Sequence, residues 1–316
     1  MKNWKRRDFL IKTTVAGIGL PVLAHNRTYE MSEVNNDSLE VHIFSKHLQF
    51  LDFKAAAEVA AEIGFSGIDL TVRPKGHIEP EEVEYNLPRA IEDISENGSS
   101  CTLITTAIES ASNPLDKKLL QTASEQGIKL YRTNWFRYKN DISMRESLLY
   151  YQNQIKDLSI LSKKLALVGA YQNHAGTSIG SSLWEVSTLL ETADKNFFGV
   201  QYDIRHAMVE GALSWPNGLK LVKDQIKTIV LKDYKWVFKN SKWELVNTPI
   251  GEGMVDFISY FKLLKKYDIQ APAILHLEYP LGGAEHGEKQ LEIDKKEVYA
   301  AMSKDLKTIR NLWAKA

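Results

Sequence analysis

The chain alternates short runs of apolar, β-branched and aromatic residues with longer stretches whose apolar positions recur at helical spacing. In the first pair, the predicted strand "LEVHIFSK" precedes the predicted helix "FKAAAEVAAEIG", which Gly64 ends. The remaining predicted strands are "GIDLTV", "CTLITTAI", "IKLYRTNW", "LALVGAYQ", "FFGVQYD", "TIVLKD" and "AILHLEYP". Further helices are predicted around residues 81–97, 115–126, 144–164, 183–194, 217–226, 255–267 and 295–315. The pattern therefore predicts eight strand–helix units.

Continuous apolar strands separated by amphipathic helices are typical of a parallel sheet that helices cover. Eight such units lie within residues 38–316, and no change in composition divides them into halves. The sequence therefore predicts a single α/β domain, a closed (β/α)8 TIM barrel, rather than two doubly wound domains. In a barrel of this type the chemistry takes place where the strands end, so polar residues at those positions become candidates for a site.

The first 24 residues do not continue this pattern. A basic head, "KRRDFLIK", is followed by a 12-residue apolar run, "TTVAGIGLPVLA", which is too short to cross a bilayer. The adjacent Arg6 and Arg7 resemble a twin-arginine export signal, and a basic amphipathic start or an uncleaved anchor is the alternative. We predict an export signal of twin-arginine type over 1–24, a linker over 25–37 and a periplasmic or otherwise exported protein. No integral membrane span is expected in the mature chain.

Charge and cysteine content narrow the choice of partner. The chain holds 40 basic and 40 acidic residues, and residues 1–24 contain five of the basic ones and one acidic one, so the remainder carries a net charge of −4. A mildly acidic chain without basic blocks argues against nucleic acid as a partner. The single cysteine, Cys101, excludes an internal disulfide and a thiolate metal cluster. A small-molecule partner is expected, and a homo-oligomer is left open.

Polar side chains lie at the ends of nearly all the predicted strands. Two neighbouring pairs, Lys232 with Asp233 and Asp69 with Arg73, are expected to form internal salt bridges. The candidates for a site at the strand ends are His47, Arg132, Gln172, Asn173, His174, Asp203, His206, Lys232, His276 and Glu278.

Two of these candidates, Asp203 and Glu278, are carboxylates that end apolar strands. A buried carboxylate costs several kcal/mol unless it is paired or bound to a cation. A divalent metal would supply the cation, with Gln172 as an oxygen ligand and His206 or His276 as a nitrogen ligand. The alternative is that a lysine or an arginine neutralises the two carboxylates.

Six motifs, in this order and at these spacings, resemble a known family. They are "GIDLTVRP", "YQNHAG", "YDIRHA", "IVLKD", "IGEGMVDF" and "LHLEYPLGGAEHG". Together they are similar to the sugar phosphate isomerase/epimerase family of xylose isomerase-like TIM barrels, and the resemblance covers roughly residues 38–315. It implies a carbohydrate as the small-molecule substrate.

The resemblance also implies a divalent metal, Mn, Zn, Mg or Co. In the family its ligands are a glutamate after strand five, an aspartate after strand six, a histidine on strand seven and a glutamate after strand eight. Asp203 and Glu278 match the second and fourth positions, whereas Gln172 stands at the first and Val230 at the third. The predicted metal ligands are therefore Gln172, Asp203 and Glu278, and the set is weaker than the family's. The resemblance further implies that His206 contacts substrate beside the metal.

The glutamine affects the expected mechanism. Family epimerases use the glutamates after strands five and eight as opposed acid and base, but Gln172 cannot titrate. A one-base reaction remains, with Glu278 as the base and with a metal, Lys232 or Arg132 stabilising the enolate. The predicted catalytic residues are Glu278, His206 and Lys232. The predicted substrate contacts are His47, Arg132, Asn173, His174, His276 and His286, the last placed by the loop "LGGAEHG" as a lid.

These expectations predict an exported carbohydrate-active isomerase or epimerase that abstracts a proton α to the carbonyl of a sugar or keto-sugar. A β-eliminating lyase or hydratase acting on 3-keto-glycosides is one alternative, and a non-catalytic sugar-binding barrel is another. Clustered charges at strand ends favour an enzyme over a simple binder. Export favours free sugars, glycosides or their keto forms as substrates over phosphate esters.

Overall fold

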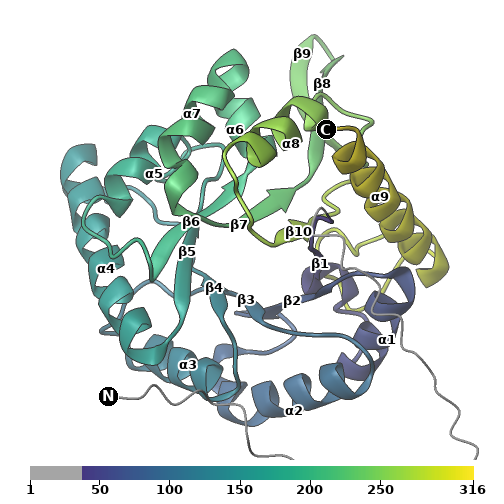
Figure 1. The fold of residues 1–316 in the computed structure, drawn as a ribbon, viewed down its shortest axis with the longest axis horizontal. Helices are drawn as coiled ribbons and strands as arrows, with labels where there is room; N and C mark the ends of the chain where they lie inside the picture. Colours follow the sequence, from purple (N-terminus) through teal and green to yellow (C-terminus); the bar gives the residue numbers. More distant parts are fainter. Residues whose placement is uncertain (1–37) are drawn as a thin grey trace, which may run out of the picture. The chain divides into compact units, whose positions relative to one another are not determined.

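Eight parallel strands close into a barrel in the computed structural model, which describes residues 38–316 (Figure 1). The strands follow the barrel in the order β1, β2, β3, β4, β5, β6, β7 and β10, and β10 pairs with β1 to close it. The predicted (β/α)8 TIM barrel is therefore confirmed. The barrel strands are β1 Val41–Phe44, β2 Gly67–Val72, β3 Leu103–Thr106, β4 Leu130–Arg132, β5 Val168–Gln172, β6 Phe198–Asp203, β7 Ile226–Leu231 and β10 Ala273–Leu275.

Helices surround the strands as an outer ring (Figure 1). They begin and end at recognisable caps: Asp52 accepts a hydrogen bond from the backbone of α1, and Gly64 ends that helix at a φ of 94°. The helices are α1 Phe53–Ile63, α2 Val83–Glu96, α3 Pro114–Glu125, α4 Met144–Leu165, α5 Leu183–Leu190, α6 Ile204–Gly211, α7 Trp215–Val222, α8 Phe257–Lys266 and α9 Lys295–Lys315. Helix α6, which follows β6 directly, was not predicted.

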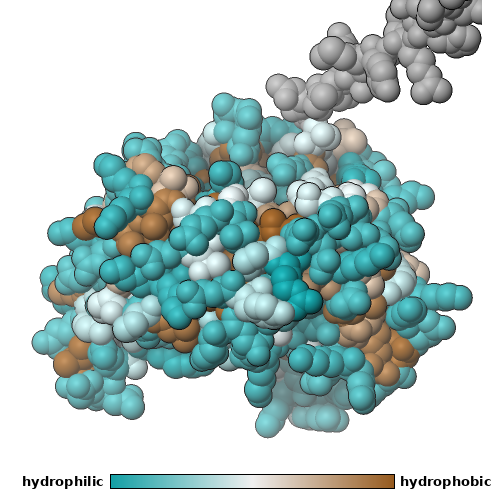
Figure 2. Space-filling model, turned by 90° about the horizontal axis from the view of Figure 1, so that it is seen from below, coloured by the Kyte–Doolittle hydropathy of each residue, from teal (hydrophilic) through white to brown (hydrophobic). Residues whose placement is uncertain are grey.

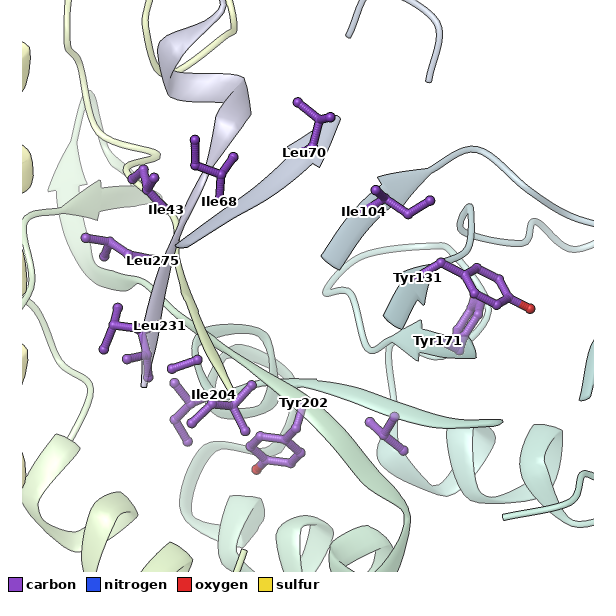
Figure 3. Close-up of a cluster of buried hydrophobic side chains, with 14 of the residues drawn as sticks. Ile43, Ile68, Leu70, Ile104, Tyr131, Tyr171, Tyr202, Ile204, Leu231 and Leu275 are labelled. Atoms are coloured by element: carbon purple, nitrogen blue, oxygen red, sulfur yellow. The ribbon is translucent and has the colours of Figure 1, made fainter. Parts of the chain in front are cut away.

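The main core lies between the barrel and this ring. Alternate strand residues point outward and pack against helices (Figure 3). For example, Tyr131 of β4 contacts Ser162 of α4 through its hydroxyl at 2.8 Å, and Tyr202 of β6 stacks on Tyr260 of α8 at 5.8 Å. The outward set labelled in Figure 3 includes Ile43, Ile68, Leu70, Ile104, Tyr171, Leu231 and Leu275. The alternate residues consequently face the barrel interior.

A β-hairpin lies between β7 and α8, within the seventh strand–helix unit, and was missed from the sequence. Strands β8 (Asp233–Lys239) and β9 (Lys242–Thr248) are antiparallel and stand apart from the barrel sheet. The turn consists of Asn240 and Ser241, both with positive φ (52° and 59°), which is the geometry of a two-residue hairpin turn. Figure 1 shows the hairpin beyond the end of β7, beside α8. Its last strand brings Asn247 back toward the barrel mouth.

The face in Figure 2 is largely hydrophilic, with apolar side chains in scattered small groups. Among residues 38–316, no helix combines the length and the apolar character needed to cross a membrane. The predicted export signal and linker, residues 1–24 and 25–37, lie outside the described residues.

Candidate active site

A cavity of about 370 Å³ opens where the barrel strands end, within the size range of small-molecule sites. Its position agrees with the expected location of chemistry in this fold. Its lining is mostly polar and charged. The lining residues are Phe44, Lys46, Arg73, Arg132, Trp135, Gln172, His174, Arg205, His206, Lys232, Asn247, His276 and Glu278.

Strand periodicity explains why these side chains converge. Residues two apart on a strand point to the same face, so Lys232 continues the inward set of β7, and His276 and Glu278 continue that of β10. Neighbours in the chain point the other way. Asp233 therefore does not pair with Lys232, and its carboxylate instead accepts hydrogen bonds from the backbone of the loop that follows the hairpin, at Gly251, Gly253 and Val255. The predicted Lys232–Asp233 salt bridge is wrong.

Asp203 lies beneath the cavity and is fully buried. Its Oδ2 receives the ammonium of Lys232 at 3.0 Å and the side-chain amide of Gln172 at 2.8 Å. Its Oδ1 accepts the backbone N–H of His206 at 3.1 Å and so caps α6. Asp203 is thus neutralised by a lysine, which was the alternative to a metal, and both of its oxygens are engaged.

His206 lies between two cations and is nearly fully buried. Its Nε2 is 2.8 Å from the Lys232 Nζ, and its Nδ1 is 3.0 Å from the Arg205 Nη1. Burial, followed by the positive charge of Lys232, lowers the pKa of His206 well below its usual value. The imidazole is therefore neutral and has one acceptor nitrogen, so only one of the two cations can donate to it at a time.

Glu278 follows β10, the strand next to β7, and its side chain lines the cavity and keeps 26 % of its exposure. Its Oε1 is 3.0 Å from the Lys46 Nζ and 3.5 Å from the His276 Nδ1. Burial alone would raise the pKa of Glu278, but the His276 contact and the charges of Lys232 and Lys46 outweigh it and hold that pKa well below its usual range. Burial lowers the pKa of His276 to about 4. The carboxylate is ionised and the histidine neutral near pH 7.

Three predicted substrate contacts do not line the cavity. The side-chain amide of Asn173 bonds both backbone groups of Asp203, at 2.8 and 3.0 Å, and so ties β5 to β6. The ring of His47 bonds the Leu277 N–H and the Ala284 carbonyl, which leaves neither nitrogen free. His286 points away, with 74 % of its side chain exposed. The structure thus gives Asn173 and His47 structural contacts and leaves His286 outside the pocket.

The other predicted side chains do converge. Arg132, Gln172, His174, His206, Lys232, His276 and Glu278 all line the cavity. Arg73 also lines it, and its predicted salt bridge with Asp69 is wrong, because Asp69 accepts the Thr105 hydroxyl at 2.8 Å instead.

Several lining residues were not predicted as site residues. Lys46 and Arg205 lie one position before the predicted His47 and His206, so the motifs were correct but the neighbouring basic residue was overlooked. Asn247 comes from the hairpin, where it accepts from Arg205 at 2.9 Å and donates to the Glu278 carbonyl at 3.1 Å. The alternating pattern of residues 233–248 around Asn240 and Ser241 was the available signal.

The closed barrel with a polar cavity at its strand ends places the chain in the class of (β/α)8 barrel proteins. Residues 57–297 match the family described as xylose isomerase-like TIM barrel. The chain belongs to this family.

A curated relative from Haemophilus influenzae, assigned as an L-ribulose-5-phosphate 3-epimerase, is 34 % identical over 68 residues. That match covers 20 % of this chain and only 24 % of the relative. A D-psicose 3-epimerase from Clostridium cellulolyticum superposes with a TM-score of 0.65 at 12 % identity, over 87 % of this chain and 99 % of the other. The 3-DHS dehydratase AsbF from Bacillus anthracis gives 0.61 at 18 % identity, over 85 % and 99 %. At these identities the two structures show a shared fold.

A divalent metal does not fit the side chains as they are arranged. A barrel of this fold from Mycobacterium smegmatis was solved with magnesium (TM-score 0.59, 10 % identity, over 85 % and 98 % of the two chains). Within residues 38–316, no three His, Cys, Asp or Glu side chains are grouped to hold a metal ion. The Lys232 ammonium contacts Asp203, and the Gln172 oxygen accepts from Arg132 at 3.2 Å. The metal that the sequence suggested stays a prediction.

Proposed function

We propose that the chain is a carbohydrate isomerase or epimerase that removes a proton from a carbon next to a carbonyl. The observation that carries the proposal is that a partly exposed carboxylate, Glu278, and a buried ammonium, Lys232, line one cavity from the neighbouring strands β10 and β7. Membership of the xylose isomerase-like family supports it, as does the short match to an epimerase. Proton abstraction α to a carbonyl needs such a pair, a base and a group that stabilises the enolate.

Glu278 is the base in this proposal. Its low pKa keeps it ionised at neutral pH, in the form that accepts a proton, but also makes it a weak base. The weakness is offset where cations stabilise the enolate oxygen, because they lower the pKa of the carbon acid. Lys46 holds the carboxylate in place. Isomerisation is complete when the proton returns to the neighbouring carbon and a hydroxyl proton moves between the two oxygens of the enediolate.

Lys232 supplies the positive charge beside this base. An ammonium has three donors, and Asp203 and His206 use two of them, so the third can reach a substrate oxygen. Arg132 adds a second cation. Lys232 therefore takes the electrostatic role that the resemblance assigned to a divalent metal, and Asp203 holds it in position.

Elimination is the second candidate reaction. Gln172, which stands where the family epimerases have a second glutamate, leaves Glu278 as the carboxylate that faces the cavity. A single base also suffices for loss of a β-hydroxyl or a β-glycosidic group from the same enolate. The shared fold with a dehydratase is compatible with this route.

The test is exchange of substrate protons with solvent deuterium. A panel of ketoses, aldoses, sugar acids and 3-keto-glycosides is incubated with the protein in D₂O and followed by proton NMR, which also separates isomerised from eliminated products. We expect exchange with at least one sugar and a loss of about 10³-fold in Glu278→Gln. The matched control is Glu92→Gln, an exposed change on α2, which should keep the wild-type rate. A panel without exchange, or full exchange in Glu278→Gln, would contradict the proposal.

We also propose that the protein is exported through its first 24 residues. Arg6 and Arg7 support this assignment, as does the apolar run after them. Replacing both arginines with lysine should retain the protein in the cytoplasm, as measured by cell fractionation against the wild-type chain. Equal distribution of the two proteins would contradict a twin-arginine route.

A further inference from the structure

Three arginines line the cavity without a carboxylate partner. Lys46 pairs with Glu278 and Lys232 pairs with Asp203, so the two acids of the site are already matched by the two lysines. Within residues 38–316, no salt bridge joins Arg73, Arg132 or Arg205 to an acidic side chain. The cavity therefore carries about three positive charges without a salt-bridge partner, and the buried Asp69, which acts on Arg73 and Arg132 without an ion-pair contact, offsets them only in part.

Burial makes this imbalance costly. Arg132 keeps only 4 % of its exposure and donates to a neutral amide, Gln172, at 3.2 Å. The Nε atoms of Arg132 and Arg205 are both buried without a hydrogen-bond partner. Burial, and then the like charge of Arg73, lowers the pKa of Arg132 to about 9, which indicates that the two guanidinium groups repel each other. A buried charge without a partner costs several kcal/mol, so this arrangement calls for an anion from outside the chain.

The aromatic side chains position the guanidinium planes. The Arg132 Cζ lies 4.4 Å from the Trp135 ring, and the Arg73 Cζ lies 5.4 Å from the Phe44 ring. When the flat face of a guanidinium stacks on an aromatic ring, the N–H groups along its edge can still donate hydrogen bonds. Those edges donate two parallel hydrogen bonds to a carboxylate or a similar oxyanion.

We propose that the sugar on which this site acts carries an oxyanion, a carboxylate, sulfate or phosphate group, bound by Arg73 and Arg132 with Arg205 in support. The proposal rests on the proposed function and adds the substrate class to it: an acidic sugar rather than a neutral one. Glu278 and Lys232 then act on the carbonyl part of the same molecule. Of these three groups, carboxylate and sulfate agree with the proposed export of the protein, which disfavours phosphate esters as substrates.

The test measures binding, so it does not depend on turnover. Isothermal titration calorimetry compares galacturonate with galactose, glucose 6-phosphate with glucose, and galactose 6-sulfate with galactose, at low and high salt. We expect at least one acidic sugar to bind about tenfold or more tightly than its neutral partner, with the preference reduced at high salt. The pair that shows the largest preference identifies carboxylate, phosphate or sulfate as the recognised group.

Two variants assign the preference to the arginines. In Arg132→Gln and in Arg73→Gln, the preference for the acidic sugar over its neutral partner should fall about tenfold. In Arg145→Gln, an exposed change on α4, this preference should be retained. Arg132→Gln should also leave the unliganded protein at least as stable as wild type, because it removes a buried charge that has no salt bridge. If Arg132→Gln fails to fold, the partly exposed Arg73 provides a second probe.

Equal binding of acidic and neutral sugars, or a preference that survives in both variants, would overturn the acidic-sugar proposal. Proton exchange on neutral sugars alone would overturn it and leave the proposed function standing. Tight binding of acidic sugars without proton exchange on any of them would contradict the proposed function and leave the acidic-sugar proposal standing.

Discussion

The two carboxylates of the site lie in opposite kinds of surroundings. Asp203 is fully buried, and both of its oxygens are engaged by Lys232, Gln172 and the N-terminus of α6. Glu278 keeps 26 % of its side-chain exposure and has one close cation, Lys46, beside a histidine whose ring nitrogens make no close hydrogen bond. The barrel thus presents a closed acid, Asp203, and an open acid, Glu278, at the same cavity.

The difference in surroundings indicates a structural role for one carboxylate and a chemical role for the other. A carboxylate whose lone pairs are all engaged holds its neighbours in place but cannot easily accept a substrate proton. A partly exposed carboxylate with one lysine partner can accept that proton. We therefore assign Asp203 to the positioning of Lys232 and His206, and Glu278 to proton transfer.

The largest expected effect comes from breaking the closed acid's ion pair. Lys232→Met leaves the Asp203 charge buried without a cation, which should reduce the free energy of unfolding by about 3–5 kcal/mol. Urea denaturation measures this loss. The double variant Lys232→Met with Asp203→Asn should recover much of it, and Lys235→Met, an exposed change on the hairpin, serves as the control. A single variant as stable as wild type would show that the pair does not neutralise Asp203.

A smaller effect concerns the histidine on the open side. The pKa of His276 is about 4 in the folded protein, below the usual 6.5, because burial favours the neutral ring. Its contribution to stability is therefore fully present above pH 6.5 and is lost as the pH falls toward 4, by at most about 3 kcal/mol. Unfolding free energies measured between pH 4 and 7 should fall less steeply in His276→Asn. Parallel pH profiles for the two proteins would show that His276 is not held neutral.

The smallest expected stability effect comes from the open acid. Glu278→Gln should change the free energy of unfolding by only about 1 kcal/mol, because the Lys46 ammonium can reach solvent once it is released. The same urea titration compares it with Asp203→Asn, in which the Lys232 ammonium stays buried. If the open acid proved as costly to remove as the closed one, the distinction between them would fail.

The parts of the site that the sequence predicted correctly follow from strand periodicity. Counting apolar runs predicted eight strand–helix units, and the polar residues that end strands, such as Gln172, Lys232 and Glu278, do meet at one cavity. The choice between partners could not be made in this way. Lys232 pairs with Asp203 on the adjacent strand rather than with Asp233 beside it, because neighbouring strand residues face opposite sides.

Residues that reach the site from loops were the hardest to predict. Asn247 arrives on a hairpin whose alternating pattern is clear only once its turn at Asn240 and Ser241 is recognised. His47 and Asn173 have the residue types of substrate contacts, but their polar atoms bond backbone groups in the structure. Sequence patterns indicate which residues end a strand, whereas the partner of each polar atom depends on packing between strands.

The most direct test of the account is deuterium exchange by protein that has been freed of metal. The protein is treated with a chelator, its metal content is checked by elemental analysis, and exchange into the accepted sugar is measured with and without added manganese, zinc, magnesium or cobalt. If Lys232 supplies the charge, the metal-free protein exchanges at the untreated rate and gains nothing from added metal. Exchange that disappears on chelation and returns with one of these ions would contradict the account, because the cation at the site would then be a metal.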